Sequence, residues 1–197
     1  MVFDRRYVRI SSRNDKGNNP FNYKNMLDDA GTHVRGGTCG DFTMPLECTL
    51  PDRGSAFLDV KHISGAFPHV CDFGVIREGA NLEVNHIAWG NALTGRTSFV
   101  GSIALTGYGA LSVDGEIVKN IDLGDLNLAT DPKDDDPMHF KDALIGLVYV
   151  ASTRTVTWKI NGKEVYSHEL PAGKWCFAVG GMGNSEFAIV KAGADDV

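Results

Sequence analysis

One stretch of the chain, residues 143–170, constrains the fold more than any other. Its sequence, ALIGLVYVASTRTVTWKINGKEVYSHEL, predicts three consecutive antiparallel β-strands. Asn161 and Gly162 predict a two-residue type I′ turn between the second and third strands, because both central positions of that turn have φ > 0. The pattern therefore indicates an antiparallel sheet.

The register that follows from this turn separates charged from apolar side chains. Lys159 is expected to face Glu164, an opposite-charge pair. Trp158 is expected to face Val165 on the other side of the sheet. Within residues 155–160 apolar and polar side chains alternate, which is the period of a strand that buries one face. The sheet is thus expected to have one wet face and one buried face.

The chain as a whole predicts more short strands and no amphipathic helix. Residues 144–150 are continuously apolar, which is typical of a central strand. Asp114-Gly115 predicts a second hairpin. The fold class is therefore all-β, a two-sheet antiparallel β-sandwich with little or no helix. The remaining strands are expected at Phe3–Ile10, Val34–Met44, Ala56–Ile63, Val70–Ile76, Thr97–Gly101, Ile103–Val113, Glu116–Leu123, Lys174–Val179 and Glu186–Val190.

Length and composition predict one domain. The chain has 197 residues and 43% hydrophobic content, enough for one full core. The sandwich is expected over residues 34–192. Residues 1–33 are expected to form an N-terminal strand and a long loop that packs on or precedes the domain, and residues 193–197 a frayed tail.

Charge and cysteine content restrict the partners and the compartment. With 19 basic and 25 acidic residues the net charge is −6, so we expect no nucleic-acid or membrane partner. The longest apolar run, residues 143–151, is too short to span a membrane, and the start has no apolar run suited to a signal peptide. Four cysteines without CxxC spacing favour a cytoplasmic chain with free thiols, with two disulfides as the alternative.

Four stretches, taken in order, resemble the SPRY domain family, the core of the B30.2 module. Leu58 stands where the family usually has Trp, and no PRY-type segment precedes the domain, so the resemblance is to a divergent member and not to a full B30.2 module. The stretches are Arg53-Gly54 with Ala56–Val60, Phe73–Ile76, Gly107–Gly115, and Ala143–Tyr149 continuing through Trp158 to Gly162.

The resemblance implies a bent two-sheet sandwich whose loops at one end bind short segments of partner proteins. We therefore expect a non-enzymatic, monomeric module that binds a protein or peptide. Aromatic and Arg side chains dominate binding hot spots, and glycines let a partner's backbone approach closely. The expected partner-binding residues are Arg53, Arg77, Asn81, Asn85, Trp89, Arg96, Tyr108, Gly181, Met182 and Asn184. Burial of Trp89 and a plain glycine turn at Gly180–Asn184 remain alternative explanations.

Catalysis and metal binding have weaker support. A glycosidase on this kind of sandwich needs two carboxylates ~5–10 Å apart, and no strand carries acidic residues at matching spacing. His69 and Cys71, with Cys39 and Cys48, are better explained as buried residues than as zinc ligands. The acidic run Asp131–Asp136 lacks the spacing of a calcium loop. We expect no catalytic residue, metal or cofactor.

Two other function classes remain open. A carbohydrate-binding, lectin-like module would use Trp89 as a platform with Asn81, Asn85 and Asn91. A structural protein would use the segment Ser11–Gly31 to pack on a neighbour.

Overall fold

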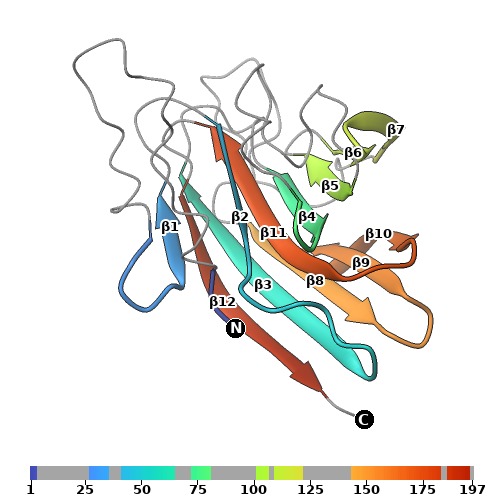
Figure 1. Ribbon diagram of the computed structural model, residues 1–197. Helices are drawn as coiled ribbons and strands as arrows, with labels where there is room; N and C mark the ends of the chain where they lie inside the picture. The colour runs from blue at the N-terminus through green and yellow to red at the C-terminus, as the bar shows by residue number, and fades with distance from the viewer. Residues whose placement is uncertain are drawn as a thin grey trace.

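The computed structural model is a two-layer β-sandwich. It describes residues 1–3, 27–35, 41–64, 72–80, 101–106, 109–121, 143–182 and 186–195. These residues form twelve strands in two six-stranded antiparallel sheets and no helix (Figure 1). The all-β prediction is therefore confirmed.

Each sheet joins strands from distant parts of the chain. The first sheet has the spatial order β1 (His33–Arg35), β12 (Glu186–Asp195), β3 (Ser55–Ser64), β8 (Leu144–Val150), β9 (Thr155–Ile160) and β10 (Lys163–Glu169). The second has the order β2 (Asp41–Pro45), β11 (Trp175–Met182), β4 (Asp72–Arg77), β5 (Ser102–Thr106), β6 (Ala110–Val113) and β7 (Glu116–Asn120).

The core lies between the sheets and is built by alternation. In β9, Val156, Trp158 and Ile160 are fully buried, while the residues between them are partly exposed. Phe73 of β4 packs edge-on against Phe187 of β12, with ring centroids 5.5 Å apart. Trp158 and Trp175 are both buried.

One buried hydrogen bond joins the two sheets through the core. The indole Nε1 of Trp158 donates to the carbonyl oxygen of Phe73 over 2.8 Å. Trp158 belongs to β9 and Phe73 to β4, so the bond ties the first sheet to the second. A buried polar group without a partner costs about 1–3 kcal/mol, and this contact therefore helps to fix how the layers superpose.

The hairpin at Asn161-Gly162 is confirmed, but its register differs in one step. Both turn residues have positive φ, 50° and 82°, and Glu164 faces Lys159 as predicted. Trp158 faces Tyr166 and not Val165, because the register shifts between residues 164 and 166. A bulge of this kind inserts one residue that the turn chemistry alone does not reveal.

Two predicted strands are each divided in the structure. Residues 34–44 were expected as one strand, but β1 and β2 lie in different sheets. Residues 103–113 form two strands, β5 and β6, which pair with each other. Gly109 has a φ of 81°, and its amide donates to the Thr106 carbonyl, so the chain reverses within an apparently continuous apolar pattern.

The C-terminal strands are longer than predicted. β11 continues through Gly180 and Gly181 to Met182, where a turn was expected, because these residues pair with β2. β12 continues to Asp195, where a frayed tail was expected. Its register shifts between Ile189 and Lys191, and the pairing with β3 then resumes to the end of the strand.

Part of the N-terminal region belongs to the core. Phe3 is fully buried and bridges Leu46, and its amide donates to the carbonyl of Gly31. Leu27 bridges Val34 of β1 and is also buried. Most of the predicted strands at residues 3–10 and 97–101 lies outside the described residues; in the described part, Gly101 is not in a strand.

Within the described ranges, no helix is long and apolar enough to cross a membrane.

Replacing Trp158 by Phe tests the bond between the sheets. The variant loses the donor to Phe73 and part of the core volume, so the free energy of unfolding in urea should fall by about 2 kcal/mol. Thr157→Val, on the outer face of the same strand, should change it by less than about 0.5 kcal/mol. Equal effects of the two changes would contradict the assigned role of Trp158.

Gly74 in β4 tests the close packing of the second sheet. A Cβ at this position would lie 2.6 Å from Cα of Ala104 and would collide with the Ile103 carbonyl oxygen. Gly74→Ala should therefore lower the free energy of unfolding by about 3 kcal/mol. Gly162→Ala, which meets open space but has a positive φ, should cost about 1 kcal/mol. Chemical denaturation of both variants measures the difference.

Candidate partner-binding site

The sandwich has two ends, and strand β11 runs from one to the other. Trp175, at its start, pairs with Arg77 of β4. Gly181, near its finish, pairs with Phe42 of β2. We call these the Arg77 end and the Gly181 end. Six residue steps along β11 separate Trp175 from Gly181, a distance of about 20 Å. The structure therefore does not bring Arg77 and Gly181 into one site, although the sequence analysis grouped them.

The Gly181 end carries most of the connections between strands. Met182 pairs with Asp41, and Gly180 pairs with Asp72, which in turn faces Thr106. Glu186 faces Ser64 in the other sheet. The strand ends gathered there flank residues 36–40, 65–71, 107–108, 122–142, 161–162 and 183–185. Two predicted binding residues, Tyr108 and Asn184, belong to these connections.

A buried carboxylate is neutralised at the edge of the Gly181 end. Glu186 is 8% exposed, and its Oε1 lies 2.6 Å from Nε2 of His33 and 2.8 Å from Nη2 of Arg35. The hydrogen bond from Arg35 to Glu186 raises the pKa of the guanidinium. These contacts hold the three-residue edge strand β1 against β12.

The start of β1 is fixed by a second carboxylate. Asp28 Oδ1 accepts hydrogen bonds from the amides of Thr32, at 2.7 Å, and His33, at 2.9 Å. Burial opposes ionisation of Asp28, but these hydrogen bonds outweigh it and lower its pKa. The turn that leads into β1 is therefore held in one conformation.

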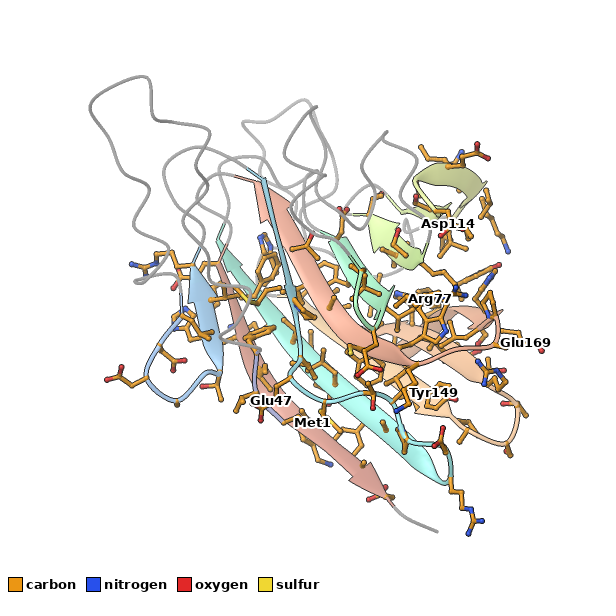
Figure 2. All side chains as sticks on the ribbon, viewed as in Figure 1. Met1, Glu47, Arg77, Asp114, Tyr149 and Glu169 are labelled. Atoms are coloured by element: carbon orange, nitrogen blue, oxygen red, sulfur yellow. The ribbon has the colours of Figure 1, made fainter. Side chains whose placement is uncertain are left out.

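The Arg77 end presents an arginine stacked on a tryptophan. The Arg77 guanidinium carbon lies 5.3 Å from the ring centroid of Trp175. Nη2 donates to the carbonyl of Ala172 over 3.3 Å, and Nε is buried without a hydrogen-bond partner. In Figure 2, Arg77 lies far from Met1 and Glu47. Stacking on an aromatic face holds the guanidinium in one orientation.

A short loop at this end, residues 170–173, is locked by side-chain donors. Arg154 donates to the carbonyls of Leu170 (3.2 Å), Pro171 (2.5 Å) and Gly173 (3.5 Å). Trp175 Nε1 also donates to Pro171, over 3.0 Å. Arg77 donates to the carbonyl of Ala172, so each of the four carbonyls of residues 170–173 accepts a side-chain hydrogen bond. The loop is a stiff platform beside Arg77.

The predicted binding residues are thus distributed over both ends. Arg53 lies in the exposed turn before β3 and belongs to the Arg77 end, where the Gly54 carbonyl accepts the amide of Ala151. Gly181 is buried within β11, and Met182 ends that strand. The other predicted residues lie outside the described part of the chain: Asn81, Asn85, Trp89, Arg96, Tyr108 and Asn184.

Sequence reasoning missed Arg154, His33 and Glu186. Their roles depend on residues 16 to 153 positions away in the chain, and no local motif marks such pairs. Glu186 is buried where its strand pairs with β1 and β3.

No group of three metal-ligating residues occurs in the described ranges. Cys48 and Cys176 are free thiols, and burial raises the pKa of Cys48. The other residues weighed as zinc ligands, Cys39, His69 and Cys71, lie outside the described part.

Neither a family model nor a curated protein sequence matches the chain. Solved structures do match. The SPRY domain of human HERC1 superposes with a TM-score of 0.58 at 15% identity, covering 83% of this chain and 89% of that one. A human SPRY domain gives 0.55 at 16%, covering 83% and 92%. The TRIM65 PSpry domain gives 0.58 at 10%, covering 96% and 91%.

These similarities show that the chain has a SPRY fold. The resemblance inferred from the sequence motifs is thereby confirmed at the level of the fold. Function has to be argued from the site, since one fold serves many functions.

Glu186→Gln tests the neutralised carboxylate at the Gly181 end. The change removes the carboxylate charge that both His33 and Arg35 contact, so the free energy of unfolding should fall by about 1–3 kcal/mol. Glu169→Gln, on an exposed position of β10, should leave stability unchanged within error. An unchanged midpoint for Glu186→Gln in urea denaturation would show that the cluster does not hold β1.

Proposed function

We propose that this chain is a non-enzymatic interaction module that binds a peptide or protein segment through the connections at its Gly181 end. The observation that supports this proposal is the gathering of six of the eleven connections between the described strands at that end of a stiff sandwich. Loops carried on a rigid scaffold are the usual place for recognition residues. The SPRY fold agrees with this, because the family resemblance implies peptide binding by loops at one end.

The strand ends beneath this surface are firmly held. β11 is hydrogen-bonded on both sides up to Gly180, by β2 and β4. The Glu186 cluster holds β1 against β12 at the same end. A partner therefore meets preformed strand ends, and less conformational entropy is lost when it binds.

The proposal assigns binding roles at this end to Tyr108, Gly181, Met182 and Asn184. Arg77 and Arg53 are not part of it, since they lie at the other end of β11. The scattered cysteines favour a cytoplasmic protein, and we retain that location and a monomeric state as parts of the proposal.

Peptide display on the purified chain provides the test. We expect selection to yield peptides whose affinity falls at least about ten-fold in Met182→Asp, because the change places a charge where β11 ends. The melting temperature should stay within a few degrees of the parent. Ile117→Asp is the matched control: Ile117 is 66% exposed on the edge strand β7, and its replacement should leave the affinity unchanged.

Three results would contradict the proposal. Equal affinity of the parent and Met182→Asp would place the site elsewhere. Unfolding of Met182→Asp would show that Met182 is a core residue. Binding of glycans in place of peptides would favour the carbohydrate-binding module.

A further inference from the structure

We infer that the Arg77 end is a second binding surface, which receives a carboxylate of an acidic protein segment. The inference does not depend on the function proposed for the Gly181 end. It comes from the state of one arginine, from the charges around it, and from the hydrogen-bonding capacity left at this end of the sandwich.

The Arg77 guanidinium is fixed in orientation, but most of its N–H donors form no hydrogen bond among the described residues. A guanidinium has five N–H donors, and the described structure gives Arg77 one hydrogen bond, the 3.3 Å contact with Ala172. Its flat face rests on Trp175, and a Cβ on Gly101 would lie 2.8 Å from Cβ of Arg77. Glycine at position 101 therefore leaves room for the Arg77 side chain. An arginine oriented in advance loses little freedom when it binds, and its planar fork matches a carboxylate.

The cations at this end have no acidic partner. In the described part of the chain, no carboxylate lies within 4.0 Å of the charged groups of Arg53, Arg77, Arg154 or Lys174. Arg35, at the opposite end, shows the contrasting arrangement, because Glu186 neutralises it within the fold. The Arg77 guanidinium is thus left without a carboxylate partner from the described part of the chain.

The backbone at this end offers few free acceptors to compete with such a ligand. The four carbonyls of residues 170–173 already accept hydrogen bonds from Arg154, Trp175 and Arg77. Asp114, in the hairpin that meets Gly101 here, is likewise engaged by the amides of Gly101 and Ser102. The remaining N–H donors of Arg77 are therefore open to an anionic oxygen.

A protein carboxylate fits this surface better than a nucleic acid does. The chain carries a net charge of −6, and four acidic residues, Asp52, Glu78, Asp114 and Glu169, share this end with the four cations. A long polyanion would meet these carboxylates, whereas a short acidic segment can place one carboxylate on Arg77.

The experiment is an NMR titration of the full chain with synthetic peptides. The probes are a capped peptide of alternating Glu and Gly, the same peptide with Gln for Glu, and a Gly-Ser peptide with a free carboxyl terminus. The signals are the Arg77 Nε–H and Trp175 Nε1–H resonances. We expect saturable shifts with the Glu peptide and at least about ten-fold weaker binding of the Gln peptide. A response to the Gly-Ser peptide instead would identify the ligand as a terminal carboxylate.

Variants separate the arginine from general charge. Arg77→Lys keeps the charge but loses the planar fork, so the affinity for the Glu peptide should fall about ten-fold. Lys191→Ala is the matched control, and it should leave the affinity for the Glu peptide unchanged. Lys191 also lies over an aromatic ring, with Nζ 4.8 Å from the centroid of Phe57, but it belongs to β12 and not to the Arg77 end. If Arg77→Lys fails to fold, Arg53→Glu on the exposed turn should still weaken binding.

Several results would overturn the inference. These are equal binding of the Glu and Gln peptides, unchanged affinity in Arg77→Lys, absence of a saturable shift, or tighter binding of a single-stranded oligonucleotide than of the Glu peptide. Met182→Asp should leave binding of the Glu peptide intact, and this separates the surface from the one proposed at the Gly181 end.

Discussion

The hydrogen bond from Trp158 to the Phe73 carbonyl is the contact on which the arrangement of the two layers depends. Apolar packing alone permits one sheet to slide over the other, because dispersion and hydrophobic burial have little directionality. A buried indole N–H has to find an acceptor, and here the acceptor belongs to the opposite sheet. The bond fixes β9 against β4, and β4 ends at Arg77. The position of the Arg77 end relative to the first sheet follows from it.

The arginines at the two ends of the sandwich have different partners. At the Gly181 end, Glu186 is buried and bound by Arg35 and the imidazole of His33, both from the edge strand. At the Arg77 end, two arginines donate to neutral carbonyls, which satisfies hydrogen bonds without cancelling charge. The first arrangement stabilises the fold at a strand edge. The second also stiffens a loop, but it leaves the two guanidinium charges without a carboxylate partner among the described residues.

Sequence reasoning succeeded where one local signal was sufficient. The Asn161-Gly162 turn, the alternation in β9 and the central place of β8 all followed from short-range pattern. It failed at register shifts, at the division of residues 34–44 between two sheets, and in grouping Arg77 with Gly181. Each failure concerns a position fixed by a strand that is remote in sequence, and a period-two pattern does not carry that information.

The sequence by itself therefore determined the fold class, the main hairpins and most of the core, since turn chemistry and side-chain alternation are local properties. Tertiary structure alone decided which strand ends meet. β11 places Trp175 beside Arg77 and carries Gly181 to the far end, while the β8–β9 turn brings Arg154 to the carbonyls of residues 170–173. These neighbours are set by pairing between segments far apart in the chain. The candidate surfaces become visible only once both sheets are assembled.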